Sequence, residues 1–190
     1  MFTGLVLVAL AVACRLISHD LALWNFVPVG AVAIYAGARM SWRWAWLVPL
    51  AAMGISDAFI HFAGSYPITS LERWTVYGSF AALTLLGPLA RRPGFRLWMA
   101  PGLGLAGSTL FFATTNFGVW AEGQLYPMNL AGLVDCYIKA IPFYQNTLVA
   151  DLLGTCVLFG VGPVIERAVS RAWSTAAPDA EAPVEVADLA

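Results

Sequence analysis

The sequence predicts an all-α membrane protein, a polytopic bundle of six transmembrane helices with a short amphipathic or re-entrant helix before the last one. Of its 190 residues, 60% are hydrophobic and 11% are charged, whereas about a quarter of the residues in soluble domains are charged. Apolar runs close to the roughly 20 residues that cross a bilayer recur along the chain. We therefore expect a lipid bilayer around the protein and no nucleic-acid partner.

The chain is organised around two apolar runs between residues 25 and 62, joined by a hinge from Arg39 to Arg43. A soluble core in a chain of this size does not accept so long an apolar stretch, which indicates a membrane hairpin. Residues 2–18 form an earlier apolar run, and its positive charge, Arg15, stands at the end. Because a secretory signal carries its positive charge before the apolar run, we expect an uncleaved first helix.

Turn and charge signals separate the remaining helices. The segment 63–73 is polar and contains Gly64 and Pro67, so we expect a loop. Residues 129–141 have helical periodicity but carry two charges four residues apart, and Pro142 follows, so we expect a short amphipathic or re-entrant segment there. The expected transmembrane helices span residues 2–18, 27–39, 42–61, 74–90, 97–117 and 143–168.

The positions of lysine and arginine predict the orientation. Seven of the ten fall on one side of the expected bundle, and Arg15, Arg73 and Lys139 fall on the other. By the positive-inside rule, both termini are cytoplasmic. We expect one transmembrane domain over residues 1–171. The segment 172–190, rich in Ala, Pro and acidic residues, is expected to be a disordered cytoplasmic tail.

Polar and aromatic side chains gather on the predicted outer side, where they are costly at membrane depth unless they are paired or line a cavity. The sequence therefore predicts an outward-facing ligand pocket. The alternative is that these residues only join the outer loops and form an interfacial aromatic belt. The expected ligand-binding residues are Asn25, Asp57, His61, Trp74, Asn116, Trp120, Tyr126, Asp135, Lys139 and Asn146.

Two stretches carry small residues four apart, Ala9 with Ala13 and Ala33 with Gly37. Such faces let helices approach closely in lipid, so we expect them to bind either a helix of the same bundle or a partner subunit. The pattern GxGxxG from Gly102 also occurs inside an apolar run, with no strand before it. We interpret it as helix packing and not as a dinucleotide site.

Chemical motifs are sparse. Asp57 and His61 lie four residues apart and form either a metal or proton site or a structural pair at a helix end. Cys136 could ligate a metal, and its role stays open. No serine-hydrolase, HExxH or DxD pattern is present. We therefore predict no enzymatic activity, no bound metal and no cofactor.

Four phrases resemble signature blocks of a widespread group of uncharacterised bacterial integral-membrane proteins of similar length: NFVPVGAVAIYAGA, WLVPLAAMGISD, LFFATTNFGVW and LVDCYIKAIPFYQNTLVADLLGTCVLFG. This resemblance covers roughly residues 5–165, and it implies a multi-pass protein of the bacterial cytoplasmic (inner) membrane. The architecture is also similar to that of the S components of energy-coupling-factor vitamin transporters. That similarity implies that the face of Ala9 and Ala13 meets a transmembrane coupling subunit and that the outer helix ends hold a vitamin.

Two functional hypotheses follow. In the first, the protein captures a small hydrophobic or vitamin-like molecule for uptake, and partner ATPases drive transport through a coupling subunit. In the second, it is a structural or assembly subunit of a larger membrane complex, without a ligand. Polar residues that converge on a cavity would favour the first hypothesis.

Overall fold

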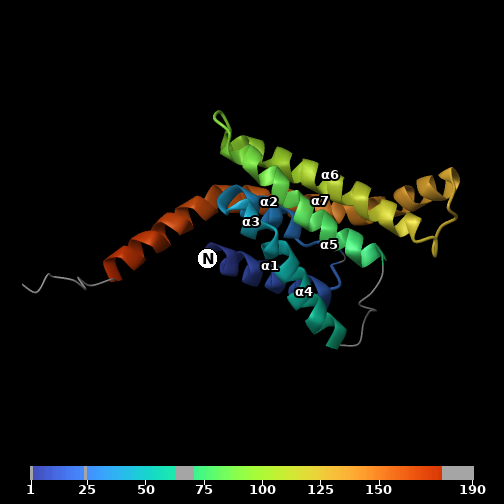
Figure 1. The fold of residues 1–190 in the computed structure, drawn as a ribbon, viewed down its shortest axis with the longest axis horizontal. Helices are drawn as coiled ribbons and strands as arrows, with labels where there is room; N and C mark the ends of the chain where they lie inside the picture. The colour runs from blue at the N-terminus through green and yellow to red at the C-terminus, as the bar shows by residue number, and fades with distance from the viewer. Residues whose placement is uncertain (1, 24, 63–70, 177–190) are drawn as a thin grey trace, which may run out of the picture.

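The computed structural model describes residues 2–23, 25–62 and 71–176. Within these ranges the chain is helical and contains no strand (Figure 1). The helices are α1 (Phe2–Asp20), α2 (Val29–Arg39), α3 (Trp42–Ala45), α4 (Leu47–Phe62), α5 (Leu71–Leu83), the 3₁₀ helices η1 (Thr84–Arg91) and η2 (Leu97–Met99), α6 (Ala100–Ala121) and α7 (Leu130–Ala176).

In the described part of the chain, three segments are long and apolar enough to cross a membrane: Thr3–Asp20, Leu97–Ala121 and Leu130–Val169. The prediction of six transmembrane helices is not confirmed. Helix α2 has 11 residues, about 16 Å of helix, whereas the hydrocarbon core is about 30 Å thick. The helix expected over 42–61 is divided into α3 and α4.

Proline accounts for one further difference. The helix expected over 74–90 begins as α5 and continues as η1, which contains Pro88. Proline lacks the N–H of an α-helical hydrogen bond, and its ring clashes with the carbonyl four residues earlier, here that of Thr84. The chain tightens into a 3₁₀ helix over this segment, and the Thr84 carbonyl is left to face α2.

The separate amphipathic or re-entrant segment expected before Pro142 does not exist. Helix α7 runs without interruption for 47 residues through both Pro142 and Pro163. Membrane helices tolerate proline because neighbouring groups and local adjustments satisfy the freed backbone. Helix α7 also continues past residue 171 to Ala176. The tail expected to be disordered, from 177 onward, lies outside the described residues.

Helix α2 is the centre of the fold. All its residues from Val29 to Ala38 are buried, and it contacts α1, α3, α4, α5, α6, α7 and η1. Its glycines permit this. A Cβ on Gly37 would overlap the backbone of Thr84, and a Cβ on Gly87 of η1 would overlap the backbone of Gly37 and Ala38. The two segments therefore cross with their backbones in contact, which small residues allow in membrane proteins.

Both ends of α2 are capped by charged side chains from distant parts of the chain. At the N-terminus, Asp151 of α7 accepts hydrogen bonds from the backbone N–H of Ala31 at 2.9 Å and from the Ser108 hydroxyl at 2.9 Å. At the C-terminus, Arg91 donates to the carbonyls of Gly37 and Ala38, each at 2.7 Å, and to that of Met40. A carboxylate and a guanidinium thus oppose the positive and negative ends of the helix dipole and satisfy its free backbone groups.

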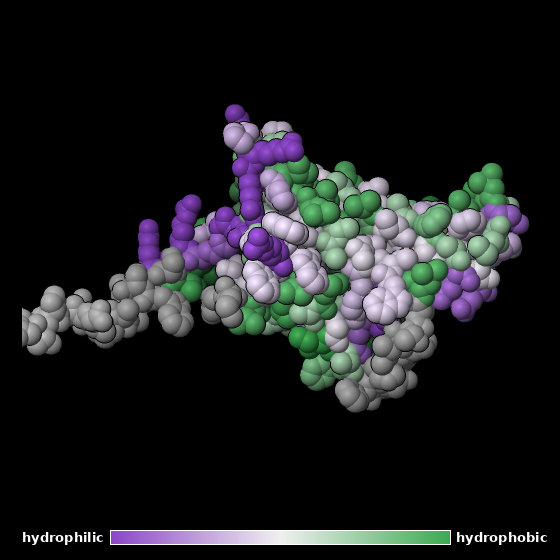
Figure 2. Space-filling view, in the orientation of Figure 1, coloured by the Kyte–Doolittle hydropathy of each residue, from purple (hydrophilic) through white to green (hydrophobic). Residues whose placement is uncertain are grey.

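Around α2, helix α6 packs along α7 and α5, and α1 packs against α4, while the last part of α7 projects beyond the bundle (Figure 1). Hydrophobic side chains cover much of the molecular face in Figure 2. Hydrophilic residues gather at the end where η1 meets α6 and α7 projects. An apolar surface bounded by a polar end is the distribution expected of a protein in a bilayer.

Candidate ligand pocket

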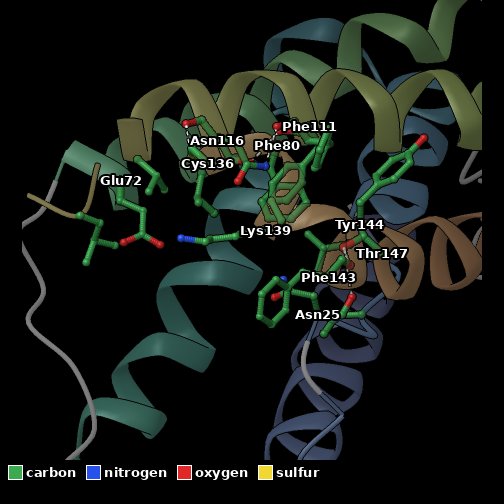
Figure 3. A pocket seen from close by; sticks show the side chains of 18 of the residues that line it. Asn25, Glu72, Phe80, Phe111, Asn116, Cys136, Lys139, Phe143, Tyr144 and Thr147 are labelled. Carbon is green, nitrogen blue, oxygen red and sulfur yellow. Dashed lines mark hydrogen bonds between the residues drawn. The ribbon is translucent and has the colours of Figure 1, made fainter. Parts of the chain in front are cut away.

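A cavity of about 420 Å³ opens between α1, the α1–α2 connection, α5, α6, the α6–α7 connection and α7. Its lining joins residues that lie far apart in the sequence (Figure 3). Four of the ten expected ligand-binding residues line it: Asn25, Asn116, Tyr126 and Lys139. The remaining polar or charged lining includes Arg15, Glu72, Thr115, Cys136 and Thr147.

Aromatic rings form much of the apolar lining. Phe80 of α5 stacks on Phe111 of α6 with ring centroids 4.5 Å apart. Phe112 lies 4.7 Å from Tyr144 of α7, measured between centroids. Figure 3 shows Phe80 and Phe111 side by side, with Phe143 across from them. Paired rings present flat surfaces of fixed orientation, which suits an apolar or aromatic ligand body.

Lys139 occupies the rim of the pocket. Its amino group donates to Asp135 at 2.7 Å and lies 5.5 Å from the centroid of the Tyr126 ring. In Figure 3 the Lys139 amino group and Glu72 point toward one another. The Lys139 side chain is 61% exposed, so it remains hydrated and can reach a charged ligand group without first being desolvated.

Local contacts position the other expected residues of the pocket. Asn25 lies in the connection before α2, and its carbonyl accepts a hydrogen bond from Thr147 at 3.3 Å. Asn25 has a positive φ of 60°, a conformation that asparagine tolerates better than most residues. The indole of Trp120 donates to the Pro127 carbonyl at 3.0 Å and so holds the connection that carries Tyr126.

Cys136 is buried in the pocket wall, with its sulfur 3.5 Å from the Asn116 carbonyl. Among the described residues, no group of three His, Cys, Asp or Glu side chains lies close enough to hold a metal ion. The contacts of Cys136 therefore place it as a small buried side chain beside Asn116.

Of the other expected ligand-binding residues, five do not line this cavity: Asp57, Trp74, Trp120, Asp135 and Asn146. Trp74 is 68% exposed, and Asn146 is also exposed. Trp120 donates its hydrogen bond to the α6–α7 connection, and Asp135 forms an ion pair with Lys139. The side chain of His61 lies outside the described part, so its pairing with Asp57 stays a prediction. Asp57, Asn116, Asp135 and Lys139 all fall on the predicted outer side, and of these four residues Asn116 and Lys139 line the cavity.

Asp57 belongs to a network beside the pocket. Its carboxylate accepts hydrogen bonds from Arg15 of α1, from Arg73 at 2.6 Å and from the Tyr77 hydroxyl at 2.9 Å. The sequence places Arg15 and Arg73 only among the charges of the predicted outer side. The available signal was an arginine inside an apolar run, since an ionisable residue at membrane depth marks a functional site by default.

The two small-residue faces have different surroundings. Ala9 and Ala13 are exposed on α1, so they remain available to a partner helix or lipid. Ala33 and Gly37 are buried in α2, and Gly37 packs against η1. Of the two uses expected for the face of Ala33 and Gly37, the structure favours contact within the same bundle, because η1 already covers Gly37.

Comparison with models of protein families matches residues 1–175 to a family described as one of unknown function (DUF6580). No curated protein matches the chain, and no solved structure matches it.

Proposed function

Because the chain belongs to the family of unknown function DUF6580, we propose its function from the pocket: the protein captures a small molecule within the membrane bundle. The supporting observation is the cavity of about 420 Å³ on which Asn25, Asn116, Tyr126 and Lys139 converge. Ligand pockets commonly measure about 300–1,000 Å³ and combine apolar walls with a few polar groups.

We further propose that the capture serves uptake, in the manner of the S component of a vitamin or nutrient transporter. The chain holds no P-loop sequence, so nucleotide hydrolysis would have to come from partner ATPases. The exposed face of Ala9 and Ala13 on α1 is the proposed contact with a transmembrane coupling subunit. The ligand is a small hydrophobic or vitamin-like molecule.

The alternative is a structural subunit without a ligand. Several polar groups do have purely structural roles, among them Asp151 and Arg91 at the ends of α2 and Glu166, which accepts hydrogen bonds from Tyr35 at 3.1 Å and from Arg39 at 2.9 Å. Each of these groups has its hydrogen-bond partners within the fold. The pocket residues instead border open volume, which favours ligand binding over scaffolding.

The proposed orientation, with both termini in the bacterial cytoplasm, predicts a labelling pattern. In a cysteine-free background, a membrane-impermeant maleimide added to intact cells should label Gln124→Cys, between α6 and α7. It should label Arg92→Cys and Ala172→Cys only after permeabilisation. Arg92→Cys and Ala172→Cys on opposite sides of the membrane would contradict this topology.

Ligand capture predicts separable effects on binding and folding. Asn116→Ala and Lys139→Ala should lose the molecule that co-purifies with the wild-type protein, because each removes a polar group at the cavity. The unliganded variants should melt near the wild type, because neither side chain supports the packing of another helix. Native mass spectrometry measures the first quantity and thermal melts in detergent measure the second.

Gln145→Ala, an exposed change on α7 outside the pocket lining, is the matched control and should retain the molecule. A broad loss of folding in Asn116→Ala and Lys139→Ala, with no bound molecule in the wild type, would instead favour the structural subunit.

A further inference from the structure

Arg15 is the cationic side chain of the pocket that lies deepest in the fold. It belongs to the apolar segment Thr3–Asp20 of α1, its side chain is 18% exposed, and it lines the cavity. Lys139, by contrast, is 61% exposed at the rim. A guanidinium largely removed from water needs hydrogen-bond acceptors and a counter-charge, because an uncompensated buried charge is strongly unfavourable.

The contacts of Arg15 do not provide acceptors for all the N–H groups of its guanidinium. A guanidinium has five N–H donors. Nη2 donates to Asp57, and Nη1 lies 2.7 Å from the sulfur of Met53, a weak acceptor. Among the side chains that the structure describes, Nε of Arg15 is the buried nitrogen or oxygen without any hydrogen-bond partner. Such an orphaned donor is rare in folded proteins and calls for an explanation.

The carboxylate of Asp57 balances the positive charge of Arg15 only in part. The same carboxylate also accepts hydrogen bonds from Arg73 and from Tyr77, both on its second oxygen. One negative charge is thus divided among three donors, and Arg15 contacts one oxygen of it. A ligand in the cavity that carries a negatively charged oxygen would accept hydrogen bonds from the guanidinium and balance the rest of its charge.

The rest of the cavity specifies what such a ligand carries besides its charge. The stacked pair of Phe80 and Phe111, with Val29 and Val76 from α2 and α5, offers an apolar surface in the same cavity. Burial of apolar area against this surface would supply binding energy, and the charged end would set the orientation.

We propose that the pocket binds an amphipathic organic carboxylate, with its carboxylate on Arg15 and its apolar body against the phenylalanine pair; this inference rests on the small-molecule capture proposed above. Carboxylate and phosphate both match the planar donor fork of arginine. The single charge of a carboxylate suits a guanidinium that Asp57 already balances in part, whereas a phosphate dianion would add repulsion with Asp57.

The test uses the full-length protein in lipid nanodiscs. Any molecule released from the natively purified protein is identified by mass spectrometry. Binding of three matched probes is measured by thermal shift and calorimetry: 3-phenylpropionate, its neutral amide, and 2-phenylethyl phosphate. We expect the released molecule to carry a carboxylate and 3-phenylpropionate to bind more tightly than either other probe.

Arg15→Gln should weaken carboxylate binding about ten- to a hundredfold, the loss of a charge-assisted hydrogen bond. Arg92→Gln is the matched control, because it removes one positive charge at an exposed position outside both the cavity lining and the Asp57 network; it should keep the wild-type affinity. Arg15→Lys retains a positive charge beside Asp57 and so protects folding, but it lacks the planar fork and should also bind the carboxylate more weakly.

Unchanged carboxylate affinity in folded Arg15→Lys or Arg15→Gln would overturn the inference, as would a neutral or cationic released molecule or equal binding of the amide. Those results would leave small-molecule capture standing. Preference for the phosphate would overturn the assignment of a carboxylate. If nothing is released and no probe binds, both this inference and the proposed function fail.

Discussion

Replacing Asp151 by alanine is expected to destabilise the bundle by about 3–5 kcal/mol, the range for removing one partner of a buried charged interaction. The carboxylate is 1% exposed and accepts hydrogen bonds from the Ala31 N–H and the Ser108 hydroxyl. Alanine would leave both donors buried without an acceptor and would remove the negative charge at the positive end of α2. Because α2 contacts seven neighbouring elements, the loss should spread through the fold.

The measurement is thermal or denaturant unfolding in detergent, followed by tryptophan fluorescence and circular dichroism. Asp135→Ala is the matched control, since Asp135 lies on the same helix but its side chain is 47% exposed. It should unfold close to the wild type, because exposed ion pairs contribute little. Asp151→Asn, which keeps the shape and one acceptor oxygen, should fall between the two. Equal stability of Asp151→Ala and the wild type would show that Asp151 does not support α2.

The second large effect is expected for Gly37→Ala, which should destabilise the protein by about 3 kcal/mol, the upper part of the usual range for overpacking. An added Cβ would overlap the backbone carbonyl of Thr84 in η1. Backbone cannot change rotamer as a side chain can, so the two segments would have to separate. That separation would also move the α2 carbonyls away from Arg91.

Gly78→Ala tests whether this cost arises from the crossing and not from the loss of a glycine. Gly78 lies in α5, and a Cβ there meets nothing within 4 Å. Alanine is a better helix former than glycine by up to about 1 kcal/mol, so this variant should be as stable as the wild type or more stable. If Gly37→Ala and Gly78→Ala shift the unfolding transition equally, the close contact of α2 with η1 is not a source of stability.

Local pattern was sufficient for the class of the protein and for several helix positions. Composition and apolar runs predicted a helical membrane protein, and α1, α2 and α6 begin and end within a few residues of the expected bounds. These properties depend on neighbours in the sequence, through hydrophobicity, periodicity and turn residues. The same pattern brought Asn116 and Lys139 to one end of the bundle, where both line the cavity.

Only the tertiary structure decided the features that depend on residues far apart in the sequence: the length of α7, the burial of α2 and the position of Arg15. Pro142 looked like a helix boundary, yet α7 continues through it, because membrane helices tolerate proline where their surroundings satisfy the freed backbone. Helix α2 looked like a span, yet it is a short buried helix whose ends are satisfied by Asp151 and Arg91, more than 50 residues away in the chain. Arg15 looked like a charge at the outer end of the first helix, yet it lines the pocket and bonds to Asp57, because an ionisable side chain at membrane depth needs a partner that only the folded bundle provides.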